Sequence, residues 1–184
     1  MQEYNKVATE LRSHFPNVTI RENERLSNYT YTKTGGPVDA LVFPKTKDEV
    51  QMIVKWAYDN RVSLTTLGNS SNVIIRDGGI RGIVIILTDL NAIVIKKNKL
   101  IVQSGASLIK TSREACKEQL TGLEFACGIP GSVGGAVYMN AGAYGGEMKD
   151  AVIKAEYVTK DGEIGEISLG EMCLGYRTSI FKQS

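Results

Sequence analysis

The chain has 184 residues, of which 42% are hydrophobic, and that length and apolar content support a folded protein with a true core. Its formal net charge is only +2 and no run of five or six like charges occurs, so the sequence gives no sign of nucleic-acid binding. Three separated cysteines and one histidine argue against a disulfide framework and against a metal site.

The N-terminal half begins with a polar stretch of mixed charge, MQEYNKVATELRSHFPN, which is neither a secretory signal nor a transit peptide. We expect a short helix there that contains Leu11. A strand over residues 38–43 ends at Pro44. Residues 46–49, with the sequence TKDE, predict a capping box, and the apolar spacing that follows predicts an amphipathic helix to about Asn60.

Three further strands are predicted before the middle of the chain. The first ends in the letters LTTLG and is followed by the polar loop GNSSN. A strand VIIR over residues 73–76 then leads through a DGG turn into the apolar strand GIVIIL over residues 82–87. Together with the preceding strand and helix, these elements indicate a βαβββ unit, and we expect residues 1–87 to form a first subdomain.

The second half contains two predicted hairpins. The first covers residues 92–105, with its turn at Asn98-Lys99, and the second covers residues 151–169, with its turn at Asp161-Gly162. Between them, Ser107 caps a helix that runs to about Gln119. We expect residues 88–184 to form a second subdomain, which gives an α+β fold of two subdomains. No apolar run is long enough to span a membrane.

The loop Gly68, Asn69, Ser70, Ser71 and Asn72 lies between two predicted strands. Its consecutive N–H groups, hydroxyls and amides suit an anion such as a phosphate. The same composition also suits a plain polar turn, and the loop alone favours that interpretation.

The segment GIPGSVGGAVYMNAGAYGG, residues 128–146, is too apolar for a linker and too rich in glycine for ordinary packing. Its glycines permit close approach to a ligand, and Pro130-Gly131-Ser132 can start a helix whose free N–H groups point the same way. The spacing matches neither the dinucleotide fingerprint nor the hydrolase elbow. Close helix packing is the alternative. One extended ligand with a pyrophosphate would explain both this segment and loop 68–72.

Four stretches together resemble the UDP-N-acetylenolpyruvoylglucosamine reductase family, FAD enzymes that make UDP-N-acetylmuramate for bacterial peptidoglycan. The resemblance runs in order from about residue 25 to the end and implies an FAD-binding fold of the vanillyl-alcohol-oxidase (PCMH) type, with FAD between two α+β subdomains. It implies FAD as cofactor and NADPH as hydride donor. The stretches are YTKTGGPVDALVFPKT, LGNSSNVIIRDGGIRGIVI, LTGLEFACGIPGSVGGAVYMNAGAYGGE and GYRTSIFK.

The resemblance also implies a set of cofactor-binding residues. The loop 68–72 would hold the pyrophosphate, the glycine-rich segment would lie along the flavin and its ribityl chain, and the TKTGG run would border the cofactor. The residues concerned are Thr34, Gly35, Gly68, Asn69, Ser70, Ser71, Asn72, Gly128, Ile129, Pro130, Gly131, Ser132, Gly134, Gly135, Asn140, Ala141 and Gly142.

Arg177, in the stretch GYRTSIFK, matches the family's active-site arginine, which is expected to bind the substrate carboxylate and stabilise the enolate-like intermediate. Tyr144 and Tyr176 are expected on the substrate side, although packing at a rim is the alternative for both. The substrate would be a UDP-linked amino-sugar enolpyruvate.

The resemblance places the proton-donating serine and its partner glutamate in a C-terminal substrate domain. Because the chain stops at Ser184, we expect that domain to be absent, so that this piece binds FAD without turnover. We expect a cytoplasmic protein that is a monomer, with no nucleic-acid or membrane partner. The alternatives are another FAD oxidoreductase of the same fold, which a histidine bonded to the flavin would favour, and a non-catalytic FAD or nucleotide-binding module.

Overall fold

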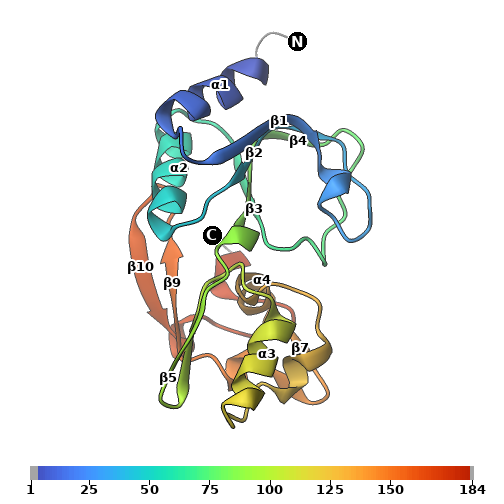
Figure 1. The fold of residues 1–184 in the computed structure, drawn as a ribbon, viewed down its shortest axis with the longest axis vertical. Coiled ribbons are helices and arrows are strands. Elements are labelled where there is room, and N and C mark those ends of the chain that lie inside the picture. The colour runs from blue at the N-terminus through green and yellow to red at the C-terminus, as the bar shows by residue number, and fades with distance from the viewer. Residues whose placement is uncertain (1–3, 183–184) are drawn as a thin grey trace. The chain divides into compact units, whose positions relative to one another are not determined.

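The computed structural model describes residues 4–182 and divides into two compact units (Figure 1). The first unit comprises residues up to Leu90 together with Val158–Glu163, and the second comprises Asn91–Tyr157 and the residues from Ile164 onward. The predicted boundary between two subdomains at residues 87 and 88 stays a prediction. The sequence did not indicate that residues 158–163 group with the first unit.

A four-stranded sheet in the order β1-β2-β4-β3 forms the centre of the first unit. Strand β1 runs antiparallel to β2, whereas β2, β4 and β3 are mutually parallel. The elements of this unit are α1 (Tyr4–His14), β1 (Thr19–Arg25), the 3₁₀-helix η1 (Leu26–Asn28), β2 (Pro37–Phe43), α2 (Lys47–Asp59), β3 (Leu64–Leu67), β4 (Ile80–Ile86) and the 3₁₀-helix η2 (Leu87–Asp89).

The two faces of this sheet are covered differently. Along β2, Ala40 and Val42 pack with α1 and α2 on one face, while Leu41 and Phe43 point to the other. That second face is covered by residues from η1 and from the segment between β3 and β4, including Leu26 and Ile75. A 3₁₀-helix and an irregular segment therefore close this side of the core, and the irregular segment contains the predicted cofactor loop 68–72.

The predicted capping box at the start of α2 is confirmed. The Thr46 hydroxyl accepts a hydrogen bond from the Glu49 N–H at 3.1 Å, and the Glu49 carboxylate accepts one from the Thr46 N–H at 3.3 Å. Each side chain thereby satisfies a backbone donor that the first helical turn leaves without a partner. Among residues 4–182, no helix has both the length and the apolar character needed to cross a membrane.

The predicted strand VIIR, residues 73–76, is wrong. These residues lie inside an irregular connection, residues 68–79, that carries the chain from β3 to β4. Ile74 is 82% exposed, while Ile75 is buried against the second face of the sheet. Two adjacent parallel strands need a connecting segment that returns along the sheet. The apolar residues of this segment therefore indicate packing onto the sheet.

Strand β1 was not predicted. Its sequence TIRENER alternates between exposed and half-buried positions and pairs with β2 from Thr19–Phe43 to Arg25–Pro37. As an edge strand it is rich in charged residues, which is how edges avoid pairing with other chains. The hydrophobic pattern did not predict this strand, because charged residues occupy the positions where alternating apolar residues would be expected.

The second unit consists of short elements around a smaller core. In chain order these are β5 (Ile93–Lys96), β6 (Lys99–Val102), α3 (Leu108–Lys117), the 3₁₀-helix η3 (Glu124–Gly128), α4 (Val133–Tyr138), β7 (Gly142–Ala143), β8 (Gly146–Glu147), η4 (Met148–Asp150), β9 (Lys154–Val158), β10 (Ile164–Ser168), η5 (Leu169–Glu171) and η6 (Ile180–Lys182). β5 pairs with β6, β7 with β8, and β9 with β10, each as a separate two-stranded sheet.

Both predicted hairpins form, with one correction. Lys96 pairs with Lys99, so the first turn is Lys97-Asn98, one residue before the predicted position. Lys97 takes the left-handed conformation, with φ 55°, that a tight hairpin turn requires. Asp161-Gly162 does lie in the second turn, where Gly162 has φ 89°.

The helix predicted after Ser107 is confirmed as α3, which ends at Lys117, two residues before the predicted end. The Ser107 hydroxyl caps it by accepting a hydrogen bond from the Lys110 N–H at 3.3 Å. The preference of serine for this position follows from such a bond.

Gly79→Ala should destabilise the first unit strongly. Gly79 has φ 73°, and a Cβ built there would lie 1.7 Å from the carbonyl oxygen of Pro37, at the start of β2. We expect a loss of about 3 kcal/mol in unfolding free energy, measured by urea denaturation. Gly78→Ala is the control, because its Cβ would meet nothing within 4 Å and should cost less than about 0.5 kcal/mol. Equal stability of the two variants would refute this packing argument.

Candidate functional site

The loop 68–72 leaves the carboxyl end of β3 in the first unit. Because β3 and β4 are parallel, residues 68–79 must return along the sheet before β4 begins, and they do so without a helix. Ligands of open sheets with parallel strands collect beyond the carboxyl ends of those strands. The position of the loop therefore agrees with its predicted role.

Ser70 is the most informative residue of this loop. It is 5% exposed, has φ 55°, and its Oγ is buried without a hydrogen-bond partner among the described residues. In the described part of the chain, the backbone N–H groups of Asn69, Ser70 and Asn72 donate to no backbone carbonyl. A buried hydroxyl left unpaired costs about 1–3 kcal/mol, so native structures rarely keep one without a reason. Phosphate oxygens would satisfy these donors, and the loop therefore fits the pyrophosphate of FAD.

The segment that contains the TKTGG run lies beside this loop. The Tyr31 N–H donates to the Ser70 carbonyl at 3.3 Å, and the Gly36 N–H donates to the Arg76 carbonyl at 3.0 Å. Residues 30–36 are thus attached to both ends of the 68–79 connection. The TKTGG run thus lies beside this connection, and its place at the border of the cofactor stays a prediction.

Interactions within the protein explain much of why Thr34 and Gly35 occupy these positions. The Thr34 carbonyl accepts a hydrogen bond from the Thr30 hydroxyl at 2.7 Å. Gly35 has φ 131°, and a Cβ there would lie 3.1 Å from the Cβ of Leu26 and 3.2 Å from that of Ile75. The glycine is therefore required by the backbone and the core, whatever ligand lies nearby.

In the second unit, the glycine-rich segment forms the predicted helix, α4. Ser132 is its N-cap residue and is 2% exposed, and its hydroxyl accepts a hydrogen bond from the Gly135 N–H at 3.4 Å. The Gly131 carbonyl accepts from the Leu108 N–H at 2.9 Å, which joins the segment to α3. Ile129 packs against the core of this unit. The Ser132 hydroxyl is thus used in capping.

The glycines of this segment fall into two groups. A Cβ at Gly134 would lie 2.8 Å from the Cβ of Ser104, and one at Gly142 would lie 2.7 Å from the Gly146 carbonyl oxygen. These two glycines serve close packing, which was the alternative interpretation. A Cβ at Gly128 would meet nothing within 4 Å, and one at Gly135 would approach only the Ser132 hydroxyl. A Cβ at Gly145 would also meet nothing within 4 Å, so packing does not explain the glycines at 128 and 145.

The side chain of Asn140 is fully occupied by other protein groups. Its Nδ2 donates to Glu147 at 2.6 Å and to the Gly175 carbonyl at 3.0 Å, and its Oδ1 accepts from the Lys149 N–H at 2.9 Å. The residue is 2% exposed. Asn140 therefore joins three segments of the second unit, and its amide has no bonding capacity left for a cofactor except through its second oxygen lone pair. Neighbouring Ala141 is buried in the same core.

Three predicted substrate residues meet at a groove of about 330 Å³ in the second unit. Tyr144 and Tyr176 are each 91% exposed, and the Arg177 guanidinium lies 5.9 Å from the centre of the Tyr176 ring. The groove is lined by Asn140, Gly142, Ala143, Tyr144, Gly145, Gly146, Glu147, Tyr176 and Arg177. The sequence prediction had therefore selected residues that the fold brings together.

Backbone strain gathers at the same residues. Tyr144 has φ 52° and Arg177 has φ 53°, values that non-glycine residues adopt at some energetic cost. Tyr176 and Arg177 form the tip of a turn closed by two hydrogen bonds between Gly175 and Thr178. Both residues line the groove, and backbone strain of this kind is common at binding sites.

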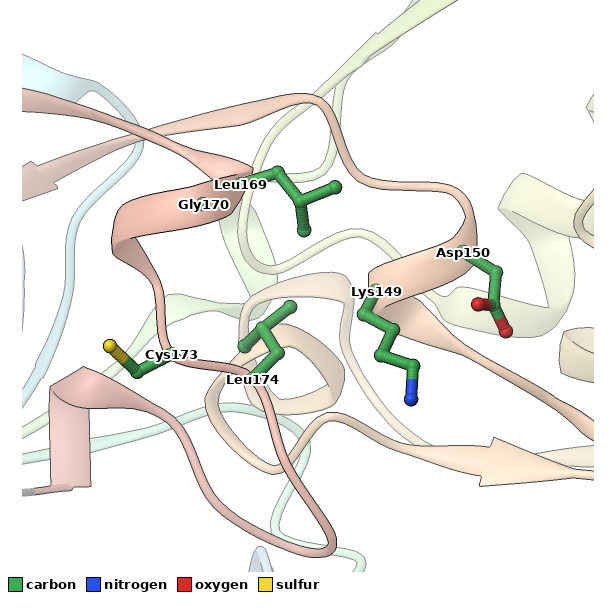
Figure 2. Close-up of a pocket in the computed structure, with 6 residues that line it drawn as sticks. All are labelled: Lys149, Asp150, Leu169, Gly170, Cys173 and Leu174. Carbon is green, nitrogen blue, oxygen red and sulfur yellow. The ribbon is translucent and has the colours of Figure 1, made fainter.

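A second pocket of about 400 Å³ lies next to η4 and η5, as Figure 2 shows. Leu169 and Leu174 point into it, and Lys149 and Asp150 lie on its other side. The Lys149 ammonium forms an ion pair with Glu147, and this hydrogen-bonded carboxylate raises the pKa of Lys149 above its usual value. The cation is therefore partly neutralised by a residue that lines the groove.

Three residues that organise these sites were missed in the sequence. Thr30 closes the turn before Gly35, Glu147 accepts from Asn140, and the Ser179 hydroxyl donates to the Tyr138 carbonyl at 2.7 Å. Ser179 is fully buried and attaches the chain after Arg177 to α4. Glu147 and Ser179 lie within the stretches that carry the resemblance, yet nothing in residue type or spacing distinguishes them as partners.

Comparison with known proteins places the chain in a family. A model of the FAD binding domain family matches residues 38–168, which is well over half of the chain. The chain belongs to this family. FAD is thus its cofactor, and the predicted α+β fold of the vanillyl-alcohol-oxidase type is confirmed. The assignment of individual residues to the cofactor stays a prediction.

The similarity to individual relatives is high. The chain is 52% identical over 165 residues to UDP-N-acetylenolpyruvoylglucosamine reductase of Pediococcus pentosaceus, which covers 90% of this chain and 55% of that protein. The crystal structure of the Thermus caldophilus reductase (MurB) gives a TM-score of 0.72 at 33% identity, over 89% of this chain and 56% of that one. The chain thus spans about half the length of these relatives.

A more distant structure shares the fold alone. Glucooligosaccharide oxidase of Acremonium strictum, whose FAD is 6-S-cysteinyl and 8α-N1-histidyl, gives a TM-score of 0.61 at 18% identity. The match covers 92% of this chain and 37% of the oxidase.

Ser70→Ala should weaken FAD binding without lowering stability. The substitution removes a hydroxyl that has no protein partner, so unfolding free energy should stay within about 0.5 kcal/mol or rise. Loss of a hydrogen bond to a charged phosphate should weaken FAD binding by roughly ten- to a hundredfold in a flavin-fluorescence titration. In the control Ser112→Ala, the lost hydroxyl donates to the Leu123 carbonyl at 2.8 Å, so stability should fall and FAD affinity should not. If Ser70→Ala lowers stability and leaves FAD affinity unchanged, loop 68–72 does not bind the cofactor.

Asn140→Ala should destabilise the second unit by about 3 kcal/mol, because it removes all three hydrogen bonds of a buried side chain that joins separate segments. Asn28 is the matched control, since it is exposed and its amide makes one hydrogen bond, to Glu24 at 3.1 Å. Asn28→Ala should change stability by less than about 0.5 kcal/mol. Thermal unfolding followed by circular dichroism tests both, and a mild effect of Asn140→Ala would show that its three hydrogen bonds contribute little.

Proposed function

We propose that this chain forms the FAD-binding part of a UDP-N-acetylenolpyruvoylglucosamine reductase. The whole protein would act as a cytoplasmic monomer and use NADPH to reduce the enolpyruvyl group of a UDP-linked amino sugar, a step toward peptidoglycan. The observation that carries the proposal is the 52% identity over 90% of this chain with the reductase of Pediococcus pentosaceus.

Loop 68–72 would bind the pyrophosphate of FAD. The Ser70 hydroxyl and the N–H groups of Asn69 and Asn72 would donate to phosphate oxygens, because they are the donors that the described chain leaves unused. In the second unit, Gly128, where a Cβ would meet nothing within 4 Å, and Gly135 would border the flavin and its ribityl chain. Once reduced by NADPH, bound FAD would supply the hydride that the substrate double bond accepts.

Arg177 would bind the substrate carboxylate. Among the described residues its guanidinium has a single contact, over the Tyr176 ring, and forms no ion pair that would neutralise it. A planar fork of donors matches a carboxylate in a bidentate way and would stabilise negative charge as it develops during reduction. Tyr144 and Tyr176 would form the walls of the groove around the sugar.

The oxidase alternative requires a group that can bond covalently to the flavin. The single histidine, His14, lies at the end of α1, where its Nδ1 contacts the Glu10 carbonyl at 2.8 Å and its ring lies 5.9 Å from that of Trp56. A role in the helix end accounts for His14, so nothing favours histidyl attachment. A non-catalytic FAD-binding module is the other alternative.

A chimera tests the proposal. Residues 1–184 would be joined to the portion of the Pediococcus pentosaceus reductase that this chain does not cover, and NADPH consumption dependent on the enolpyruvyl substrate would be measured. We expect turnover by the chimera and FAD binding without turnover by the chain alone. Flavin that is retained but inert in the chimera would favour the module, and oxygen-dependent oxidation of a sugar would favour the oxidase.

Arg177→Lys in the chimera should lower kcat/KM by about a hundredfold or more, because lysine cannot form the bidentate fork. FAD content should not change. Arg113→Lys is the control, since Arg113 is exposed on α3. If both variants keep full activity, Arg177 does not bind the carboxylate.

A further inference from the structure

Thr30 is buried beside the cofactor loop without belonging to it. The residue is 2% exposed, and its hydroxyl donates to the Thr34 carbonyl at 2.7 Å. Its own carbonyl accepts from the Lys33 N–H at 3.2 Å, and Lys33 takes the left-handed conformation with φ 56°. The Thr30 side chain therefore closes a tight turn over residues 30–34.

This turn is attached directly to the loop that we assign to the pyrophosphate. Tyr31, the residue after Thr30, donates its N–H to the Ser70 carbonyl at 3.3 Å. That hydrogen bond fixes the peptide plane that follows Ser70, at the residue whose φ is 55° and whose hydroxyl is unsatisfied. The turn and the loop are thus one hydrogen-bonded structure within the first unit.

We infer that Thr30 is a positioning residue for FAD binding. Its side chain bonds to the Thr34 backbone and lies outside loop 68–72, but it holds the 30–34 turn so that the Tyr31 N–H fixes the carbonyl of Ser70. Ser70 then keeps the left-handed conformation that presents its hydroxyl and the neighbouring N–H groups together. The inference rests on the assignment of loop 68–72 to the pyrophosphate.

Preorganised donors bind an anion more tightly than donors that must first be ordered, because the entropy of ordering is lost before the ligand arrives. Loss of the Thr30 hydroxyl leaves the Thr34 carbonyl without this partner and frees the turn. The effect should be confined to ligands that carry phosphate. Binding of riboflavin, which has none, should not depend on the order of this loop.

The variant that tests the inference is Thr30→Val, which keeps the shape of the side chain and removes the hydroxyl. We expect FAD affinity to fall about tenfold, riboflavin affinity to stay within twofold, and Thr30→Ser to restore FAD binding. The matched control is Thr111→Val. Thr111 is buried too, and its hydroxyl donates to the Ser107 carbonyl at 2.9 Å, but it lies on α3. Its FAD affinity should not change.

The outcomes separate two kinds of failure. If Ser70→Ala leaves FAD affinity unchanged, the assignment of the loop is wrong. If Ser70→Ala weakens binding but Thr30→Val does not, the loop binds FAD and the role of Thr30 is refuted. If Thr30→Val lowers the affinities for FAD and riboflavin equally, Thr30 only stabilises the fold in general, and the inference is also overturned.

A measurement on the unaltered chain covers the case in which Thr30→Val does not fold. Coupling between two sites is reciprocal, so FAD must order the turn if the turn orders the FAD loop. Saturating FAD should slow hydrogen exchange at the Tyr31 amide, while exchange at the Thr111 amide, in α3, stays the same. Unchanged exchange at Tyr31 would overturn the inference.

Discussion

The parallel pairing of β3 with β4 is the constraint on which the first unit depends. Two adjacent parallel strands force the chain to return along the sheet, and here the return is made by residues 68–79 without a helix. Such a segment must find other partners for its backbone and must pack its apolar side chains. It does both against residues 26–36: the Tyr31 and Gly36 N–H groups donate to the Ser70 and Arg76 carbonyls, and Ile75 packs in the same cluster as Leu26. An irregular loop thereby becomes rigid enough to present donors in a fixed arrangement.

The second unit reaches order by a different route. Its sheets have only two strands each, and such small sheets are marginal alone. Side-chain hydrogen bonds to the backbone, chiefly those that Asn140 and Ser179 donate, connect segments that share little regular structure. The glycine-rich segment consequently serves two purposes. Gly134 and Gly142 allow close packing against neighbouring segments, whereas Gly128 and Gly145 leave open space.

Local signals in the sequence predicted local structure well. The capping box of α2 and the Asp161-Gly162 turn were found because their physical causes involve residues close together in sequence. The prediction of a strand at residues 73–76 was wrong because apolar residues indicate burial but do not show how a segment is buried. A segment that packs against the face of a sheet has the same apolar pattern as a strand within it. Strand β1 escaped notice because an edge strand has no need of apolar alternation.

The candidate site was predicted from a resemblance, and residue roles show the limit of that approach. Among the described residues, the Ser70 hydroxyl has no hydrogen-bond partner and the Arg177 guanidinium forms no ion pair, which leaves both available to a ligand. Asn140 was placed in the same set, although the fold itself consumes its amide. Which hydrogen bonds are already made depends on residues far away in sequence, such as Gly175, and no spacing rule contains that information.

The left-handed residues Ser70, Tyr144 and Arg177 have a consequence for protein engineering. Each adopts a backbone conformation that glycine would adopt with less strain, and the described side chains contribute few contacts that the fold would miss. A laboratory selection for heat resistance would therefore tend to accept glycine at all three. The proteins recovered would be more stable, and they would have lost the side-chain groups that each unit offers to a ligand.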